Sequence, residues 1–73
     1  MKFYTYSNNI STYTKAISLE NVRSVEDTVD MVAGRAYYGV QVNYYNGEQE
    51  NFTWLGKEES KKVLKEIVDL LNK

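Results

Sequence analysis

Acidic side chains are the main candidates for acid–base or metal chemistry in this sequence, because the chain contains neither histidine nor cysteine. Glu48 and Glu50 lie two residues apart, so they share a face if they belong to a strand. Glu26, Asp27 and Asp30 form a second cluster that would attract a hard cation, but it lacks the glycine-punctuated ladder of a calcium loop. We interpret both groups as solvated charges and expect no catalytic residue, no metal site, no cofactor and no enzymatic activity.

Aromatic residues are the most unusual part of the composition. The chain has seven tyrosines, one tryptophan and two phenylalanines, and most of them fall in segments with strand character. The doublets Tyr37-Tyr38 and Tyr44-Tyr45 would each place one ring on either face of a strand. Tyrosine is a good strand residue in its own right, and its ring also offers a stacking surface for a partner's side chains or for bases.

Two kinds of partner would use such rings. The leading hypothesis is a protein-interaction module that uses its outer sheet face or an open strand edge to bind a second copy of the chain or another protein. Homodimerisation is favoured, because an unprotected edge invites pairing with an identical edge. The candidate residues of the interaction surface are Tyr37, Gln41, Asn43, Tyr45, Asn51 and Thr53. The alternative is a single-stranded nucleic acid bound by Tyr37, Tyr45, Arg23 and Arg35. The formal net charge of −1 disfavours nucleic acid, because such binding needs a continuous positive surface.

The elements that position these residues are clearest at the end of the chain. Residues 57–72 carry apolar side chains at helical spacing, with charged residues on the other side, which predicts an amphipathic helix. The apolar positions are Val63, Leu64, Ile67, Val68, Leu70 and Leu71. Gly56 breaks the preceding strand, and the apolar stripe predicts that the helix packs on one face of a sheet.

A hairpin precedes the helix, with residues 36–45 and 48–55 as its strands and Asn46-Gly47 as its turn signal. A two-residue loop at this signal would place the valines of one strand and the large aromatics of the other on opposite faces. A three-residue loop, 45–47, with glycine in the left-handed position, unites them instead.

The three-residue loop pairs Val40 with Phe52 and Tyr38 with Trp54. One face then carries Tyr38, Val40, Val42, Phe52 and Trp54. We prefer this register because a helix with one apolar stripe needs one apolar sheet face to cover. We therefore expect Trp54 to be buried against the helix.

The first half of the chain is less regular. Residues 3–7 and 13–19 have strand-forming composition, with Asn8-Asn9 as a turn between them, and residues 22–29 form a third run. Residues 31–35 are expected to connect that run to the hairpin. The sequence thus predicts an α+β domain with about five antiparallel strands in a meander, followed by one helix.

Two resemblances bear on function. The segment Ile17-Ser18-Leu19-Glu20-Asn21-Val22-Arg23-Ser24-Val25-Glu26, followed by an Asn-Gly hairpin and a terminal helix, resembles the latter part of small bacterial PH-like domains and short uncharacterised bacterial or phage proteins. This resemblance implies a binding module. The order of strands followed by a helix is similar in topology to the single-stranded-DNA-binding domain of the PC4 type, which implies a dimer with an aromatic, basic sheet surface.

The length of 73 residues accommodates a single domain, with residues 1–56 forming strands and 57–72 the helix. The first residues alternate in polarity, unlike a signal peptide or a membrane span, and cysteine is absent. We therefore expect a cytoplasmic protein that does not bind membranes, and the first resemblance implies that it is of bacterial or phage style. A core this small has a thin stability margin, and homodimerisation is a common remedy.

Overall fold

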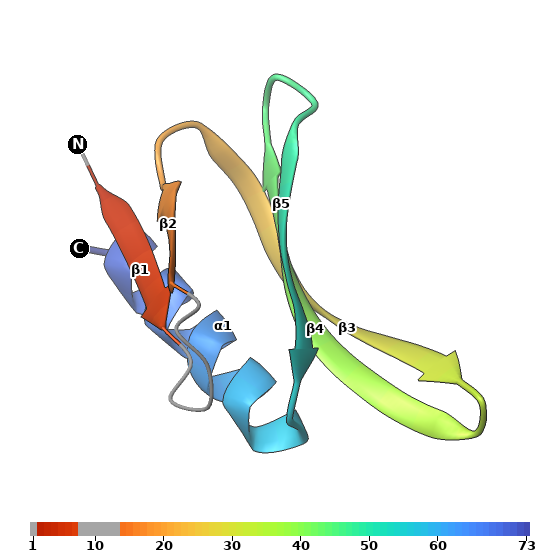
Figure 1. Ribbon diagram of the computed structural model, residues 1–73. Coiled ribbons are helices and arrows are strands. Elements are labelled where there is room, and N and C mark those ends of the chain that lie inside the picture. The colour runs from red at the N-terminus through yellow and green to blue at the C-terminus, as the bar shows by residue number, and fades with distance from the viewer. Residues whose placement is uncertain (1, 8–13) are drawn as a thin grey trace.

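The computed structural model describes residues 2–7 and 14–73 of the chain. Its elements are β1 (Phe3–Ser7), β2 (Thr14–Ser18), β3 (Val22–Val32), β4 (Arg35–Tyr44), β5 (Gln49–Leu55) and α1 (Lys57–Leu71). β1 pairs with β2 in one antiparallel sheet, and β3, β4 and β5 form a second one in that order (Figure 1). The predicted α+β class, five antiparallel strands and terminal helix are confirmed. The turn predicted at Asn8-Asn9 lies outside the described residues.

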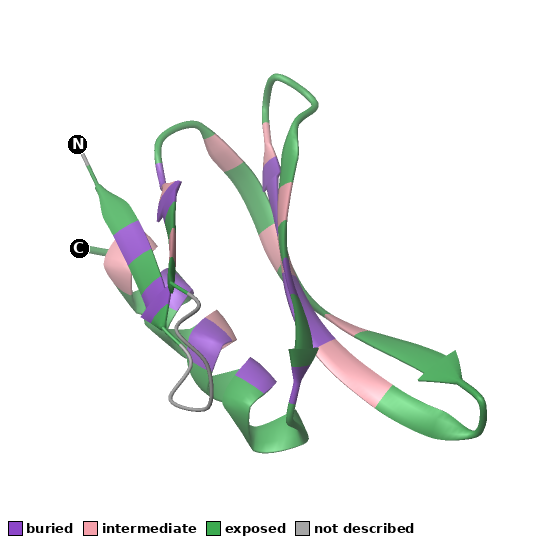
Figure 2. Ribbon diagram, viewed as in Figure 1, coloured by how far each residue is buried: buried purple, intermediate pink, exposed green. Residues whose placement is uncertain are grey.

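One core lies where the helix, the first sheet and the middle of the second sheet meet (Figure 2). Alternate residues of the strands face inward, and the helix contributes the centre of its predicted apolar stripe. The buried apolar residues are Tyr4, Tyr6, Ile17, Leu19, Val40, Val42, Phe52, Leu55, Val63 and Ile67. Every element except β3 supplies at least one of these residues, and Val22 and Val25 of β3 pack against them, so the two sheets and the helix fold as one unit.

Hydroxyl groups fix the first strand to the helix. The Tyr4 hydroxyl donates a hydrogen bond to the Glu66 carboxylate at 2.8 Å, and the Tyr6 hydroxyl donates one to Glu59. Both tyrosine rings are buried, and their hydroxyls reach carboxylates at the margin of the helix. At the end of α1, the Lys2 ammonium donates to the Leu70 carbonyl at 3.0 Å, which supplies a donor to a helix terminus that lacks basic residues of its own.

The register chosen for the β4–β5 hairpin is confirmed at its turn end. Val40 lies opposite Phe52, and the loop contains three residues ending in Gly47, whose φ is +91°. The Gly47 amide donates to the Tyr44 carbonyl at 3.1 Å, as expected for a turn with a glycine bulge.

The predicted pairing of Tyr38 with Trp54 is wrong, because β5 contains a bulge. Between the Val40–Phe52 pair and the next pair, Tyr38–Leu55, β5 has one residue more than β4. Trp54 has a φ of +63°, so its side chain leaves the inner face and is 72% exposed, while Leu55 takes the buried position. Trp54 is therefore not buried against the helix, contrary to expectation.

The connection predicted at residues 31–35 is also wrong. β3 continues to Val32, and β4 begins at Arg35 after a two-residue turn formed by Ala33 and Gly34, with φ values of +50° and +79°. Positive φ at both central residues matches the twist of a tight hairpin. The result is a long β3–β4 hairpin whose end, residues 28–37, projects away from the helix (Figure 1). We call this segment the arm.

Candidate interaction site

The inner face of the arm continues the apolar face of the second sheet. Val29 and Met31 follow the alternation of β3 and share this face with Val40 and Val42 of the hairpin's body, and the exposed Asp27, opposite Val40, is the charged residue between them. Val40 and Val42 are 1% and 0% exposed, whereas Val29 and Met31 are 57% and 68% exposed. The same apolar face is therefore covered at one end of the hairpin and open at the other.

The outer face of the arm is aromatic. The rings of Tyr37 and Trp54 meet edge to face, with centroids 4.7 Å apart and an interplanar angle of 70°. Together with Thr28 and the exposed Val32, they border a shallow hollow of about 120 Å³. Both faces of the arm thus present apolar or aromatic surface, which is uncommon for a segment in contact only with water.

The free edge of β3 has a different character. Glu26, Asp27 and Asp30 are all exposed along this strand, which among the described strands pairs with β4 alone. Charges on an edge strand discourage pairing with another edge, because two such strands would bring like charges together. Within the part of the chain that the structure describes, no acidic residues gather closely enough to hold a metal ion. These acids therefore discourage pairing at the β3 edge, with Asp27 on the inner face and Glu26 and Asp30 on the outer face.

The middle of the outer face is occupied by a polar network. The Asn43 side chain donates to the Ser24 hydroxyl at 3.0 Å and to the Glu26 carboxylate at 3.2 Å. The Gln41 amide donates to the Asn43 oxygen at 2.8 Å and also reaches Glu26. Asn43 is buried and its hydrogen bonds are made within the sheet, so its first role is to join β3 and β4.

The structure divides the predicted protein-binding surface. Tyr37 and Thr53 border the aromatic hollow of the arm, whereas Gln41 and Asn43 belong to the polar network. Asn51 lies opposite Gln41 on the same face of the sheet. Tyr45 belongs to the β4–β5 turn, at the other end of the sheet from the arm, and is exposed.

The four residues predicted to contact nucleic acid form two separate pairs. Arg35 and Tyr37 lie on the arm, while Arg23 and Tyr45 border a hollow at the β4–β5 turn. The acidic residues of β3 lie between the two pairs. The arrangement does not bring these arginines and rings into one positive groove.

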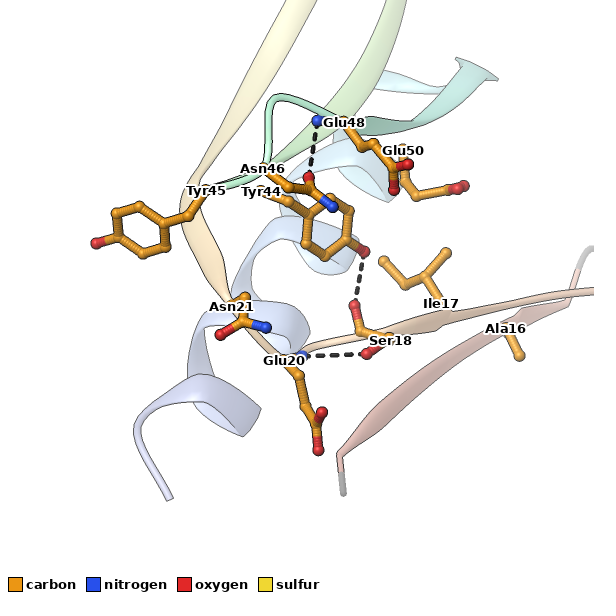
Figure 3. Close-up of a pocket in the computed structure, with 10 residues that line it drawn as sticks. All are labelled: Ala16, Ile17, Ser18, Glu20, Asn21, Tyr44, Tyr45, Asn46, Glu48 and Glu50. Atoms are coloured by element: carbon orange, nitrogen blue, oxygen red, sulfur yellow. Dashed lines mark hydrogen bonds between the residues drawn. The ribbon is translucent and has the colours of Figure 1, made fainter.

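A larger cleft opens between β2 and the turn end of β4 and β5 (Figure 3). Its volume is about 620 Å³ and its rim carries Glu20, Glu48 and Glu50. Tyr44 points into it and donates its hydroxyl to the Ser18 carbonyl at 2.6 Å (Figure 3). Burial raises the pKa of Tyr44, and the charges of Glu50 and Glu48 raise it further, so the ring remains a neutral donor.

Lys15 forms a second bridge across this region. Its ammonium donates to the Asn51 carbonyl at 2.9 Å, forms an ion pair with Glu50 at 3.0 Å and lies 5.1 Å from the centre of the Phe52 ring. Lys15 belongs to β2, whereas its three partners belong to β5. The two sheets are therefore tied here by side chains.

Sequence reasoning missed the exposed apolar residues of the arm. Val29 looks like a core residue by alternation, and Met31 falls in the connection expected at residues 31–35. The pattern does not reveal that the helix fails to reach either of them. A usable signal existed for Trp54: Gly39 interrupts β4 opposite the bulge, and a glycine inside a strand often marks a bulge or a close backbone approach.

Comparisons of the chain with models of protein families, with curated proteins and with solved structures found no match. Among residues 2–7 and 14–73, no helix has the length and apolar character needed to cross a membrane.

Proposed function

We propose that the protein is a non-enzymatic interaction module that forms a homodimer through the inner face of its arm. One observation carries this proposal: the apolar sheet face that packs on the helix continues onto the arm, where Val29 and Met31 have no cover among the described residues. Soluble monomers rarely leave a contiguous apolar surface open, and such surfaces often mark protein interfaces.

Self-association fits the shape and charge of the arm. In a two-fold dimer the same patch is used by both copies, so one flat apolar face is sufficient to build the interface. If the two arms lie antiparallel, Arg35 at each tip comes near the base of the other arm, where Asp27 lies on the inner face. Burying Val29 and Met31 in this way adds apolar contact to a domain whose own core is small.

The experiment is light scattering behind size exclusion across a wide concentration range. The double variant Val29→Thr, Met31→Thr keeps residues that tolerate a strand but removes the apolar surface. Phe3→Thr is the matched control, because Phe3 is an exposed apolar strand residue outside the arm. We expect the wild type and Phe3→Thr to dimerise with similar affinity and the arm variant to remain monomeric.

A wild-type protein that stays monomeric at all concentrations contradicts the proposal, and so does an arm variant that dimerises as well as the control. The same samples are run with a mixed single-stranded oligonucleotide at low salt. A mass increase with oligonucleotide that disappears as salt rises would support nucleic-acid binding instead.

A further inference from the structure

The free edge of β5 faces β2 beside the cleft, and from β5 the cleft is lined by Glu50. In an antiparallel ladder, residues alternate between bonding the neighbouring strand and pointing their backbone groups away from it. The Asn51 carbonyl accepts its hydrogen bond from Lys15 of β2, so Asn51 is one of the residues whose backbone points away from β4. By alternation, Gln49 and Thr53 present their amides and carbonyls to the same edge.

β2 presents an open edge to the same cleft. The Leu19 amide bonds the Lys2 carbonyl on the β1 side, and the alternation along β2 then turns the backbone groups of Ala16 and Ser18 away from β1. The Ser18 carbonyl accepts its hydrogen bond from Tyr44, which confirms this direction. Among the described residues, no backbone ladder connects β2 with β5.

Two side chains donate hydrogen bonds to edge carbonyls that the backbone amides of an added strand would otherwise bond. Lys15 donates to the carbonyl on the β5 edge, and Tyr44 donates to the carbonyl on the β2 edge. Each bridge satisfies one acceptor and leaves the neighbouring edge groups, including those of Gln49 and Ala16, without a backbone partner in the described chain. An extended chain lying along the β5 edge would supply amides and carbonyls at the regular spacing of a ladder.

We propose that the free edge of β5, which runs beside the cleft, binds an extended segment of another polypeptide carrying a lysine or arginine, which adds to this edge as a strand. Backbone hydrogen bonds to Gln49 and Asn51 hold the segment, and the glutamates at the cleft rim select its charge. This interface is separate from the arm, so it does not depend on dimerisation.

The glutamates at the cleft rim indicate the charge of the peptide that binds. Within the described residues, Glu50 is paired with Lys15, whereas Glu20 and Glu48 have no basic partner. A basic side chain is therefore attracted, and an acidic one is repelled. The chain's own exposed strand, β3, carries three acids between residues 26 and 30, so a second copy offering that strand is the wrong partner for this cleft.

The test uses nuclear magnetic resonance titrations of the labelled protein with synthetic peptides. Two strand-forming peptides of about eight residues alternate valine and threonine and differ only in carrying two lysines or two glutamates. We expect the lysine peptide to shift the amides of Gln49, Asn51 and Thr53 saturably and to slow their hydrogen exchange. A third peptide, the lysine version with alternate backbone amides methylated, lacks the ladder donors and is expected to bind at least about tenfold more weakly.

Two protein variants test which side chains of the protein set its affinity for the lysine peptide. Lys15→Met frees the Asn51 carbonyl and the Glu50 carboxylate, so it is expected to bind the lysine peptide more tightly. Glu48→Gln removes a rim charge and is expected to weaken binding about two- to fivefold, whereas Glu58→Gln, an exposed helix glutamate, is the control that leaves it unchanged.

Equal affinity for the lysine and glutamate peptides would overturn the proposal. Amide shifts that avoid β5, or full binding of the methylated peptide, would also overturn it, since either result means that no strand is added.

Discussion

The body and the arm of the β3–β4 hairpin have the same strand pairing and similar apolar residues but opposite environments. In the body, Val40 and Val42 are covered by the helix and the first sheet, whereas in the arm Val29 and Met31 face outward. Alternation thus specifies which face of a strand is apolar, and the reach of the covering elements decides how much of that face is buried. The uncovered remainder is the surface available for a partner.

The bulge at Trp54 marks the boundary between these two regions. On the body side, β5 pairs with β4 in the predicted register, and beyond the bulge its ladder ends at Leu55. Gly39 of β4 lies against the Phe52 carbonyl oxygen, where a Cβ would be only 2.4 Å away. A bulge increases the local twist of a sheet, which accounts for an arm that turns away from the helix.

The largest difference between body and arm is expected for truncation of an apolar side chain. Ile67 is fully buried in the helix–sheet core, so Ile67→Ala should lower the free energy of unfolding by about 2–5 kcal/mol. Met31→Ala removes a side chain of similar size from the exposed arm and should change the stability of the monomer by less than about 0.5 kcal/mol. Urea denaturation followed by circular dichroism, at a concentration where the protein is monomeric, measures both. Similar losses in the two variants would mean that the arm is covered in solution.

The second prediction concerns the bulge between body and arm, which is tested by substituting Gly39. Gly39→Ala forces a Cβ against the Phe52 carbonyl, and we expect it to cost roughly 1–3 kcal/mol of stability. Gly56→Ala is the matched control, because a Cβ at position 56 meets no atom within 4 Å. The same denaturation experiment compares them. If both glycines tolerate alanine equally, the bulge is not the constrained joint between body and arm.

The smallest expected effect concerns how the free energy of unfolding changes at alkaline pH. It compares the substitution of the buried Tyr4 with that of the exposed Tyr45. Burial raises the pKa of Tyr4 above its ordinary value of 10.0, and the hydrogen bond to Glu66 and its charge raise it further. The folded state therefore keeps a proton that the unfolded state loses, so this stabilisation is complete below pH 10 and declines as the pH rises above it, by at most about 1.4 kcal/mol per pH unit.

The measurement is the free energy of unfolding between neutral pH and pH 11 for the wild type, Tyr4→Phe and Tyr45→Phe. Tyr4→Phe should be less stable at neutral pH, because the Glu66 hydrogen bond is lost, but it should lose less stability above pH 10. Tyr45→Phe should follow the wild type. Parallel curves for all three proteins would show that Tyr4 ionises in the fold as easily as in water.

The sequence was sufficient for the fold class, the helix and the register at the β4–β5 turn, because each depends on local periodicity or on one glycine at a turn. The position of Trp54 was not predictable by alternation. A single extra residue in β5 pairs Leu55, in place of Trp54, with Tyr38. The open arm depends on how far the helix reaches, which is a property of tertiary packing. The cleft depends on β2 and the turn end of the β4–β5 hairpin, which are distant in sequence and come together only in the folded chain.

The exposed position of Trp54 makes it an optical reporter of the outer face of the arm. Its indole is the only one in the chain and lies outside the core, so its emission should be nearly solvent-like in the native state and change little when the core unfolds. A partner that covers the outer face would shift the emission to shorter wavelengths, whereas a dimer formed through the inner face would leave it almost unchanged. Fluorescence and circular dichroism therefore record separate events in this protein, the first at the arm and the second in the body.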